Sequence, residues 1–559
     1  MSASMRSASR AIWVLAGILL GGVLPGALGV AAADSSQSPS VTNAPIPTRG
    51  GTLRLALPSD VASLDPALAF DTVSAPFLLL LYEGLVEYDD GLNLLPCLAK
   101  DWTVSADQRT YTFHLRPGVR FSNGREVEAS DFVFSLQRVL DPKTCALTES
   151  YFEGIAGAKD FQAGKARNVR GLRAPRGDTL EIQLEQPDLS FLYTLTLPGA
   201  YVVPREAVER YGKSFTSHPV GTGPYVLNDW RRGVKMRFER NPLYRRADRQ
   251  HLDAVEVMVG GDDTLHLMMF ERGELDIADI AENPGVPVPD FIRVERSARL
   301  RNQIERIQAA FTWWLFLNTE MEPFDNPKVR QAVSHAINKD KLVRLFHGMV
   351  ARANGVLPPP IPGFNSKLTG YAFDPIRARQ LLEESGHAGG FACKLWYEAG
   401  NVFIGPMASA IQFDLAQVGI TAQLNPVAMA PLLESIQRRR TAQCGIMGWS
   451  QDYPDPSDFL DVNFNGNRIT DEGCQNLPFY NSPQVNKLLA EATRCDDPAR
   501  RLRIYQAAEQ IVVDDAAVVP LCYPYIYALR QPWLHGLHLH PVWYFRFERM
   551  WMQPPEILR

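Results

Sequence analysis

Residues 444–460 read CGIMGWSQDYPDPSDFL. The apolar start, Cys444–Met447, predicts the end of a buried strand, and the Pro-rich remainder predicts a loop. An aromatic and an acidic residue in such a loop suit a ligand crevice: Trp449 offers a flat wall or a cation–π partner, and Asp452 an acceptor for a ligand cation. The competing interpretation is a plain turn that Asp455-Pro456 stiffens.

Strands and helices are interspersed on both sides of this stretch. Apolar residues alternate with polar ones in three predicted strands, 52–57, 110–115 and 179–184. Helical spacing after an Asn-Pro or Asp-Pro start predicts helices over 326–337, from 374 to about 385, and over 497–514. The sequence therefore predicts an α/β fold.

Composition sets limits on size and partners. The chain has 559 residues, a net charge of −5, 46% hydrophobic and 21% charged residues. This is ordinary globular usage, which excludes a mainly disordered or collagenous protein, and the length allows three or four compact units. No basic excess points to nucleic acid as a partner.

The N-terminus has the pattern of a secretory signal peptide. Arg6 and Arg10 precede an apolar run over 11–24, and small residues up to Ala33 form a cleavage site. The run is shorter than the ~20 residues that span a membrane. We expect residues 1–33 to be removed near Ala33 and 34–49 to be a flexible leader. No cysteine follows the run to take a lipid, so the mature protein is expected in the periplasm without a membrane span.

The search for catalytic chemistry gives no candidate. The stretch 221–224 lacks the third glycine of a dinucleotide loop, and no GxSxG or HExxH occurs. The histidines of 535–540 are irregularly spaced, so a solvated or packed face is favoured over a metal site. We therefore predict no enzyme activity and no cofactor. The seven cysteines are an odd number, and Cys444 with Cys474 is the expected pair if one forms.

A series of short motifs carries a family resemblance through the mature chain. In order they are Ser63–Pro66, Tyr82–Leu85, Leu95–Trp102, Tyr111–Phe121, Ser122–Gly124, Asp131–Arg138, Val220–Tyr225, Arg240–Tyr244, Val329–Ala332, Ala336–Lys339, Gly448–Leu460 and Val519–Leu521. Each match is weak, but their number, order and spacing are specific. The chain resembles the family 5 extracytoplasmic solute-binding proteins, whose best-known members bind dipeptides and oligopeptides for ABC importers.

The resemblance implies a type II (cluster C) periplasmic-binding-protein fold with two hinged lobes built from three domains and mixed sheets. Domain I would comprise 50–84, 205–305 and 526–559. Domain II would be inserted over 85–204, and domain III, the second lobe, would span 306–525. Ligand would be enclosed between the lobes, and binding would shift the population towards closure.

The resemblance also implies roles for particular residues. Asp452 would pair with the α-ammonium of a peptide, and the main chain of Gly448 and Ser450 would pair with its backbone. Trp449 would wall a side-chain pocket beside Tyr453. An edge from the other lobe would comprise Phe70, Asp71 and Thr72. The aromatic near the ligand would be Phe134, and a weak carboxylate anchor would be Arg438. A solvated charged turn is the competing interpretation of Arg438, because Ile446 stands where one relative has the basic residue.

We therefore expect a monomeric peptide receptor that works with a membrane permease and an ATPase. The alternative keeps the fold and changes the ligand to a murein peptide, an antimicrobial peptide, chelated nickel, haem or an oligosaccharide. Asp452 favours an ammonium-bearing ligand over a sugar. An exported hydrolase is the remote third interpretation, since no nucleophile or metal motif supports it.

Overall fold

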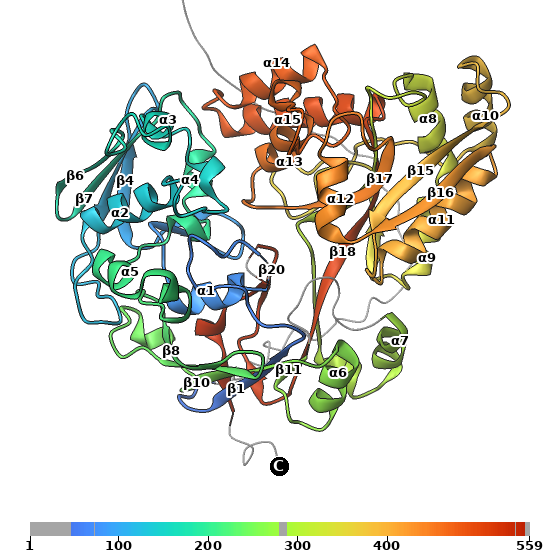
Figure 1. The fold of residues 1–559 in the computed structure, drawn as a ribbon. Coiled ribbons are helices and arrows are strands. Elements are labelled where there is room, and N and C mark those ends of the chain that lie inside the picture. Colours follow the sequence, from blue (N-terminus) through green and yellow to red (C-terminus); the bar gives the residue numbers. More distant parts are fainter. Residues whose placement is uncertain (1–45, 72, 279–287, 543, 554–559) are drawn as a thin grey trace, which may run out of the picture. The chain divides into compact units, whose positions relative to one another are not determined.

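The computed structural model describes residues 46–71, 73–278, 288–542 and 544–553. Strands and helices are interspersed along this part of the chain, which confirms the α/β class (Figure 1). The predicted signal peptide and most of the predicted leader lie outside the described residues, as does Thr72. Among the helices that are described, none has the length and apolar character needed to cross a membrane.

The first sheet joins segments from two distant parts of the chain. Its strand order is β1 (Thr52–Leu57), β10 (Ala254–Val259), β9 (Lys235–Arg240) and β8 (Tyr225–Arg231). β1 runs parallel to β10, and the other pairs are antiparallel. Leu53, Leu55 and Leu57 of β1 are buried, so the predicted alternation is confirmed as one buried face. Helix α1 (Ala75–Leu81) contributes Phe77 to the same core.

The second sheet is antiparallel and covered by one amphipathic helix. Its order is β4 (Ala99–Val104), β5 (Thr110–Leu115), β7 (Thr179–Gln183) and β6 (Leu172–Arg176). Tyr111, Phe113 and Leu115 of β5 point into the core, as the alternation predicts. Helix α2 (Ala129–Val139) packs on β6 and β7. The short turn η1 (Glu149–Tyr151) follows, then α3 (Ala158–Gln162) and α4 (Phe191–Thr194).

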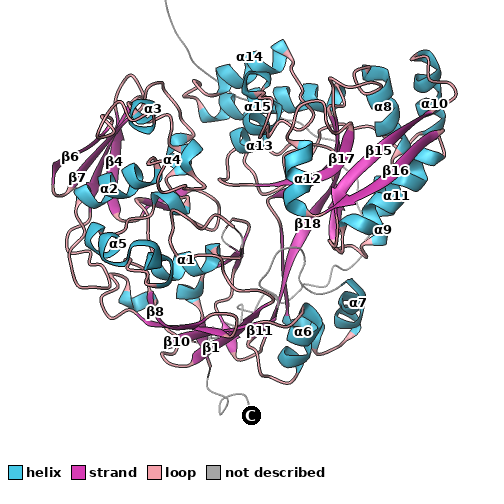
Figure 2. Ribbon diagram, viewed as in Figure 1, coloured by secondary structure: helices cyan, strands magenta, loops and turns pink. Residues whose placement is uncertain are grey.

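The largest sheet has a single long strand as its spine. The path is β11 (Ile277–Ala278), β18 (Val518–Arg530), β13 (Phe311–Leu317), β17 (Cys444–Ser450), β15 (Phe391–Glu398) and β16 (Ile420–Val427); β12 (Ile304–Gln308) and β14 (Val350–Arg352) also pair with β18. The first half of β18 pairs with β13 and β14, and the second half with β12 and β11. Figure 2 shows β18 running from the region of β17 to β11.

The predicted helices are confirmed together with their capping residues. Asn326, Asp374 and Asp497 accept hydrogen bonds from the first turns of α8 (Pro327–Ala336), α10 (Pro375–Glu384) and α15 (Pro498–Asp514). Gly386 follows α10 with φ 84°, the left-handed conformation that glycine favours. The other helices are α5 (Arg205–Tyr211), α6 (Asp263–Glu271), α7 (Val288–Arg296), α9 (Lys339–Leu345), α11 (Ile404–Ala416), α12 (Met429–Ile436), α13 (Pro456–Phe464) and α14 (Pro483–Ala492).

Pairs of very short strands complete the described elements. They are β2 (Val86–Tyr88) with β3 (Leu94–Pro96), β19 (Leu534–His535) with β22 (Trp551–Met552), and β20 (Leu539–His540) with β21 (Tyr544–Phe545).

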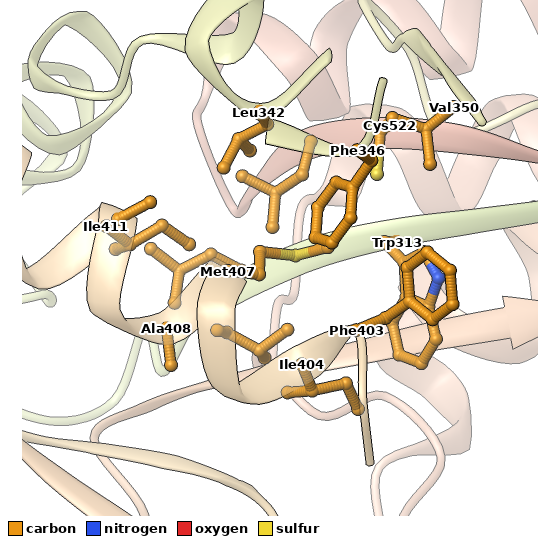
Figure 3. Packing of buried hydrophobic residues seen from close by; sticks show 14 of the residues in the cluster. Trp313, Leu342, Phe346, Val350, Phe403, Ile404, Met407, Ala408, Ile411 and Cys522 are labelled. Carbon is orange, nitrogen blue, oxygen red and sulfur yellow. The ribbon is translucent and has the colours of Figure 1, made fainter. Parts of the chain in front are cut away.

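Helix α11 packs its apolar face on β15 and β16 (Figure 1). Figure 3 shows Met407 of this helix beside Phe346, and the Phe346 and Phe403 rings lie 5.0 Å apart. Close packing of this kind fixes the sheet that carries β17.

The expected pairing of Cys444 with Cys474 is wrong. All seven cysteines are free, and the thiol nearest to Cys444 is that of Cys393, with 4.0 Å between the sulfur atoms. Cys393 and Cys444 lie on the neighbouring strands β15 and β17. Cys474 instead follows an extended loop and donates its S–H to the carbonyl of Asn476. The spacing along the chain could not show which strands are neighbours.

Asp276 ties β1 to β11 through a buried carboxylate. The side chain is 0% exposed and accepts from the Arg54 main-chain N (2.8 Å), the Arg54 Nη2 (2.7 Å) and the Trp533 Nε1 (2.9 Å). Arg54 is 42% exposed, so part of its attraction is screened by water.

The Arg54 Nε is a fourth donor, 3.1 Å from the Asp276 Oδ2. We predict that Asp276→Asn lowers the free energy of unfolding by about 2–4 kcal/mol, because a neutral amide cannot satisfy all four donors. Denaturant unfolding measures the change. Asp253→Asn is the control: its carboxylate is 61% exposed in its pair with Arg240, so a loss below about 1 kcal/mol is expected. Equal losses in the two variants would contradict the role given to Asp276.

Candidate functional site

The last residues of β17 have one edge that no described strand covers. β13 pairs with the whole strand, from Cys444 to Ser450, whereas β15 pairs only with Cys444 and Gly445. An uncovered edge presents main-chain N–H and C=O groups that an extended ligand can pair with. Gly448 and Ser450, predicted to pair with a peptide backbone, lie on this stretch.

Gly448 allows an aromatic ring to lie directly against the strand. A Cβ atom built at this position would come within 2.3 Å of the Phe311 ring and 2.9 Å of the Trp313 ring. Phe311 and Trp313 are themselves 4.7 Å apart between ring centroids. Both rings belong to β13, the strand paired with β17. The absence of a side chain at Gly448 therefore lets the two rings approach the part of β17 whose other edge is uncovered.

Trp449 and Asp452 are held by a single oxygen atom. Asp458, on α13, accepts from the Trp449 Nε1 at 3.0 Å and from the Asp452 main-chain N at 2.9 Å, both through its Oδ2. Asp458 is 0% exposed, whereas Trp449 and Asp452 are half-buried. The predicted pocket wall, Trp449, and the predicted amine anchor, Asp452, are therefore held in place by the same side chain.

The Asp452 carboxylate also receives a hydrogen bond from a distant part of the chain. The Tyr151 hydroxyl, from η1 beside the second sheet, donates to Asp452 Oδ2. Burial raises the pKa of Asp452 to about 6, and the neighbouring Tyr151 and Asp458 side chains act in the opposite direction. At pH 7 the group is therefore mostly a carboxylate, ready to pair with a cation.

Aromatic rings gather at this carboxylate. The Tyr151 ring lies 5.9 Å from Phe70 and 6.2 Å from Tyr453, both edge to face. Three segments far apart in the sequence thus meet around Tyr151, which binds Asp452, and two further predicted site residues, Phe70 and Tyr453, belong to them. An acidic group among aromatic faces suits a ligand ammonium.

Sequence reasoning missed two residues of this arrangement, Tyr151 and Asp458. Tyr151 belongs to no motif, and 301 residues separate it from Asp452. Asp458 lies inside the quoted stretch, but its helix spacing gave no reason to single it out.

Asp455 and its partner fix the far side of the loop. Asp455 accepts from the Ser457 main-chain N (2.9 Å) and so begins α13, and its carboxylate forms a buried ion pair with Arg501 (2.6 Å). The Asp455-Pro456 step is therefore a helix start, and the preceding loop is anchored to α15.

Three predicted site residues make their described contacts elsewhere. Asp71 is exposed and accepts from the Ser74 main-chain N ahead of α1. Phe134, on α2, lies under the Arg205 guanidinium at 4.7 Å. Arg438 pairs with Glu434 and Glu472 at the surface.

Arg438 and Asp452 flank opposite ends of β17. A role for Arg438 as a carboxylate anchor, at the end of the ligand away from Asp452, stays a prediction. Thr72, the remaining candidate, lies outside the described residues.

Comparison with known proteins defines the class of protein. The family model described as "Bacterial extracellular solute-binding proteins, family 5 Middle" matches residues 93–471, well over half of the chain. The chain belongs to this family. The match includes the second sheet, β17 and the Asp452 loop.

Particular relatives match almost the whole chain, one in sequence and two in solved structure. The glutathione-binding protein GsiB of Escherichia coli O1:K1 is 29% identical over 503 residues, which cover 88% of this chain and 93% of GsiB. The solved structure of clavulanic acid biosynthesis oligopeptide binding protein 2 has a TM-score of 0.84 at 26% identity, with 91% and 96% covered. DppA from Helicobacter pylori, solved with the peptide STSA, has a TM-score of 0.75 at 27% identity, with 91% and 99% covered. These matches confirm the predicted periplasmic-binding-protein fold.

We predict that Gly448→Ala destabilises the protein by about 1–3 kcal/mol, because the added methyl group must displace the Phe311 ring. Thermal unfolding measures the change. Gly405→Ala on α11 is the control, since a Cβ there meets nothing within 4 Å and stability should stay equal or rise slightly. An unaffected Gly448→Ala protein would show that the ring contact is not tight.

Proposed function

We propose that this protein is an exported, non-catalytic receptor that binds peptides by their free amino end and delivers them to an ABC importer. The observation that carries the proposal is the Asp452 carboxylate, which lies at the end of the uncovered edge of β17 and among aromatic rings. The relatives named for glutathione and oligopeptides, and DppA with its bound peptide, support the ligand class.

Side chains differ between peptides, but the α-ammonium and the backbone are constant. Asp452 would pair with the ammonium, and the Tyr151 hydroxyl beside it can accept from the same group. The edge at Gly448–Ser450 would pair with the first peptide units as an added strand. Trp449 and Tyr453 would contact side chains near the amino end. Glutathione fits this scheme because it also carries a free α-ammonium.

We further propose that the ligand lies between two lobes. Residues 50–84, 205–305 and 526–559 would form domain I, 85–204 domain II and 306–525 domain III. In support, the second sheet falls within 99–183, and Tyr151, which follows α2, reaches the Asp452 loop of the third sheet. The antiparallel pair β12–β18, which lies where domain I meets domain III in the chain, would be the hinge.

We predict that Asp452→Asn abolishes tight binding of peptides with a free amino end and leaves the fold intact. A buried charge without its partner costs about 3–5 kcal/mol, which is roughly two to three and a half decades of affinity. Isothermal titration calorimetry measures the loss. The wild-type protein should likewise reject N-acetylated forms of the same peptides.

Asp471→Asn is the matched control, because it removes the same charge from a carboxylate that is 83% exposed. Its affinity should equal that of the wild-type protein. Undiminished binding by Asp452→Asn, or equal affinity for acetylated peptides, would refute the amine-anchor role.

The raised pKa of Asp452 predicts a pH dependence of binding. In the free protein this pKa is about 6, and a bound ammonium favours the charged form and lowers it. Affinity should therefore be constant above about pH 7 and fall as the pH drops, by about twofold at pH 6 and about tenfold at pH 5. Calorimetry at pH 7.5 and 5.0 tests this, and the same affinity at both values would contradict it.

A further inference from the structure

Two buried aspartates, one capping helix α13 and one in its first turn, have opposite surroundings. Asp455 is 2% exposed, and both of its carboxylate oxygens accept from Arg501, at 2.6 and 2.7 Å. Asp458, three residues later, is 0% exposed. Its two donors in the described structure are uncharged N–H groups, those of Trp449 and Asp452, and both bind Oδ2. Its Oδ1 is buried and has no hydrogen-bond partner among the described atoms.

The titratable groups that face Asp458 are themselves acids. Asp452 and Tyr453 come from the loop before α13, and Tyr151 comes from η1. Arg501, a cation of the packed helix α15, is already engaged by Asp455. An ionised carboxylate here would be buried beside a second carboxylate without a counter-ion, which is strongly unfavourable. A neutral carboxyl group avoids both penalties.

The electrostatic surroundings agree with the contacts. Burial, followed by the charge of Asp452, raises the pKa of Asp458 well above its usual range. The group therefore keeps its proton at neutral pH, and Asp452 is the one that ionises. Two neighbouring carboxyl groups whose surroundings separate their pKa values commonly take different roles.

We propose that Asp458 is a positioning residue of the ligand site, a permanently protonated carboxyl group whose one oxygen holds both the Trp449 indole and the Asp452 main chain on helix α13. The part of this inference that concerns ligand binding rests on the proposed function. Its consequence is that the site presents one negative charge and therefore matches a ligand end with a single ammonium. A dicationic end would leave one charge unpaired.

Asp458→Asn tests whether the carboxyl group is protonated, and Asp458→Ala tests whether it positions Trp449 and Asp452. Asparagine is neutral and keeps an acceptor oxygen, so Asp458→Asn should bind peptides within about threefold of the wild-type protein and keep the pH midpoint of binding near 6. Alanine removes the acceptor, so affinity should fall about tenfold or more as Trp449 and Asp452 lose their support. Rescue by asparagine, measured by calorimetry across pH 5–7.5, distinguishes positioning from charge.

Asp455→Asn is the internal control, since it breaks the ion pair with Arg501 at an equally buried position. Its melting temperature should fall by several degrees, while that of Asp458→Asn should stay unchanged. The infrared difference spectrum of wild-type minus Asp458→Asn protein at pH 7.5 should contain the C=O stretch of a protonated carboxyl group.

A shift of the pH midpoint by one unit or more in Asp458→Asn, or a carboxylate band in place of the acid band, would overturn the protonated state. Wild-type affinity in Asp458→Ala would overturn the positioning role. The infrared and melting measurements need no ligand. If the wild-type protein bound no peptide, the proposed function would fail while these two measurements still decided the state of Asp458.

Discussion

The arrangement of the site depends on strand β17, whose last residues are paired with another strand on one side only. β17 is paired along its whole length on the β13 side but only at its first two residues on the β15 side. The remaining residues keep the geometry of a strand inside a large sheet and yet expose one edge. A ligand that pairs with this edge gains main-chain hydrogen bonds that do not depend on its side chains. The loop that begins where the strand ends then places Asp452 at a fixed distance from that edge.

Rigidity around the loop has identifiable sources. Asp455 is bound to Arg501, Asp458 holds two N–H groups, and the Phe311 ring lies against Gly448. Of these residues only Gly448 is proposed to touch a ligand. Together they fix the positions of Trp449 and Asp452 before a ligand arrives, which reduces the entropy lost on binding. Tyr151 comes from a different part of the chain, so its bond to Asp452 is the contact that domain movement would alter most directly.

Local chemistry made much of the fold predictable. Strands 52–57 and 110–115 appear with the bounds that alternation gives, and the helices that follow Asn326, Asp374 and Asp497 begin with these residues as caps. Such features depend on neighbours within a few residues. The cysteine prediction failed because thiol contacts depend on strand order: Cys444 lies beside Cys393, on a strand 51 positions away, and not beside Cys474.

The site shows the same division between local and long-range information. The resemblance placed Asp452, Trp449 and Gly448 on one segment, and in the structure the first two are hydrogen-bonded to the same oxygen of Asp458. Tyr151 could not be predicted, since only the packing of distant segments brings its hydroxyl to Asp452. Arg438 precedes β17, and its described ion pairs are with Glu434 and Glu472, contacts that the sequence pattern did not indicate. The burial that keeps Asp458 uncharged is likewise a property of the packed chain.

A crystal structure with a short unmodified peptide, such as a tripeptide of alanine, tests the central claim most directly. The account predicts the peptide ammonium within hydrogen-bond distance of the Asp452 carboxylate and the first peptide units paired with the β17 edge at Gly448–Ser450. A peptide bound with its amino end away from Asp452, or without main-chain bonds to this edge, would contradict the account.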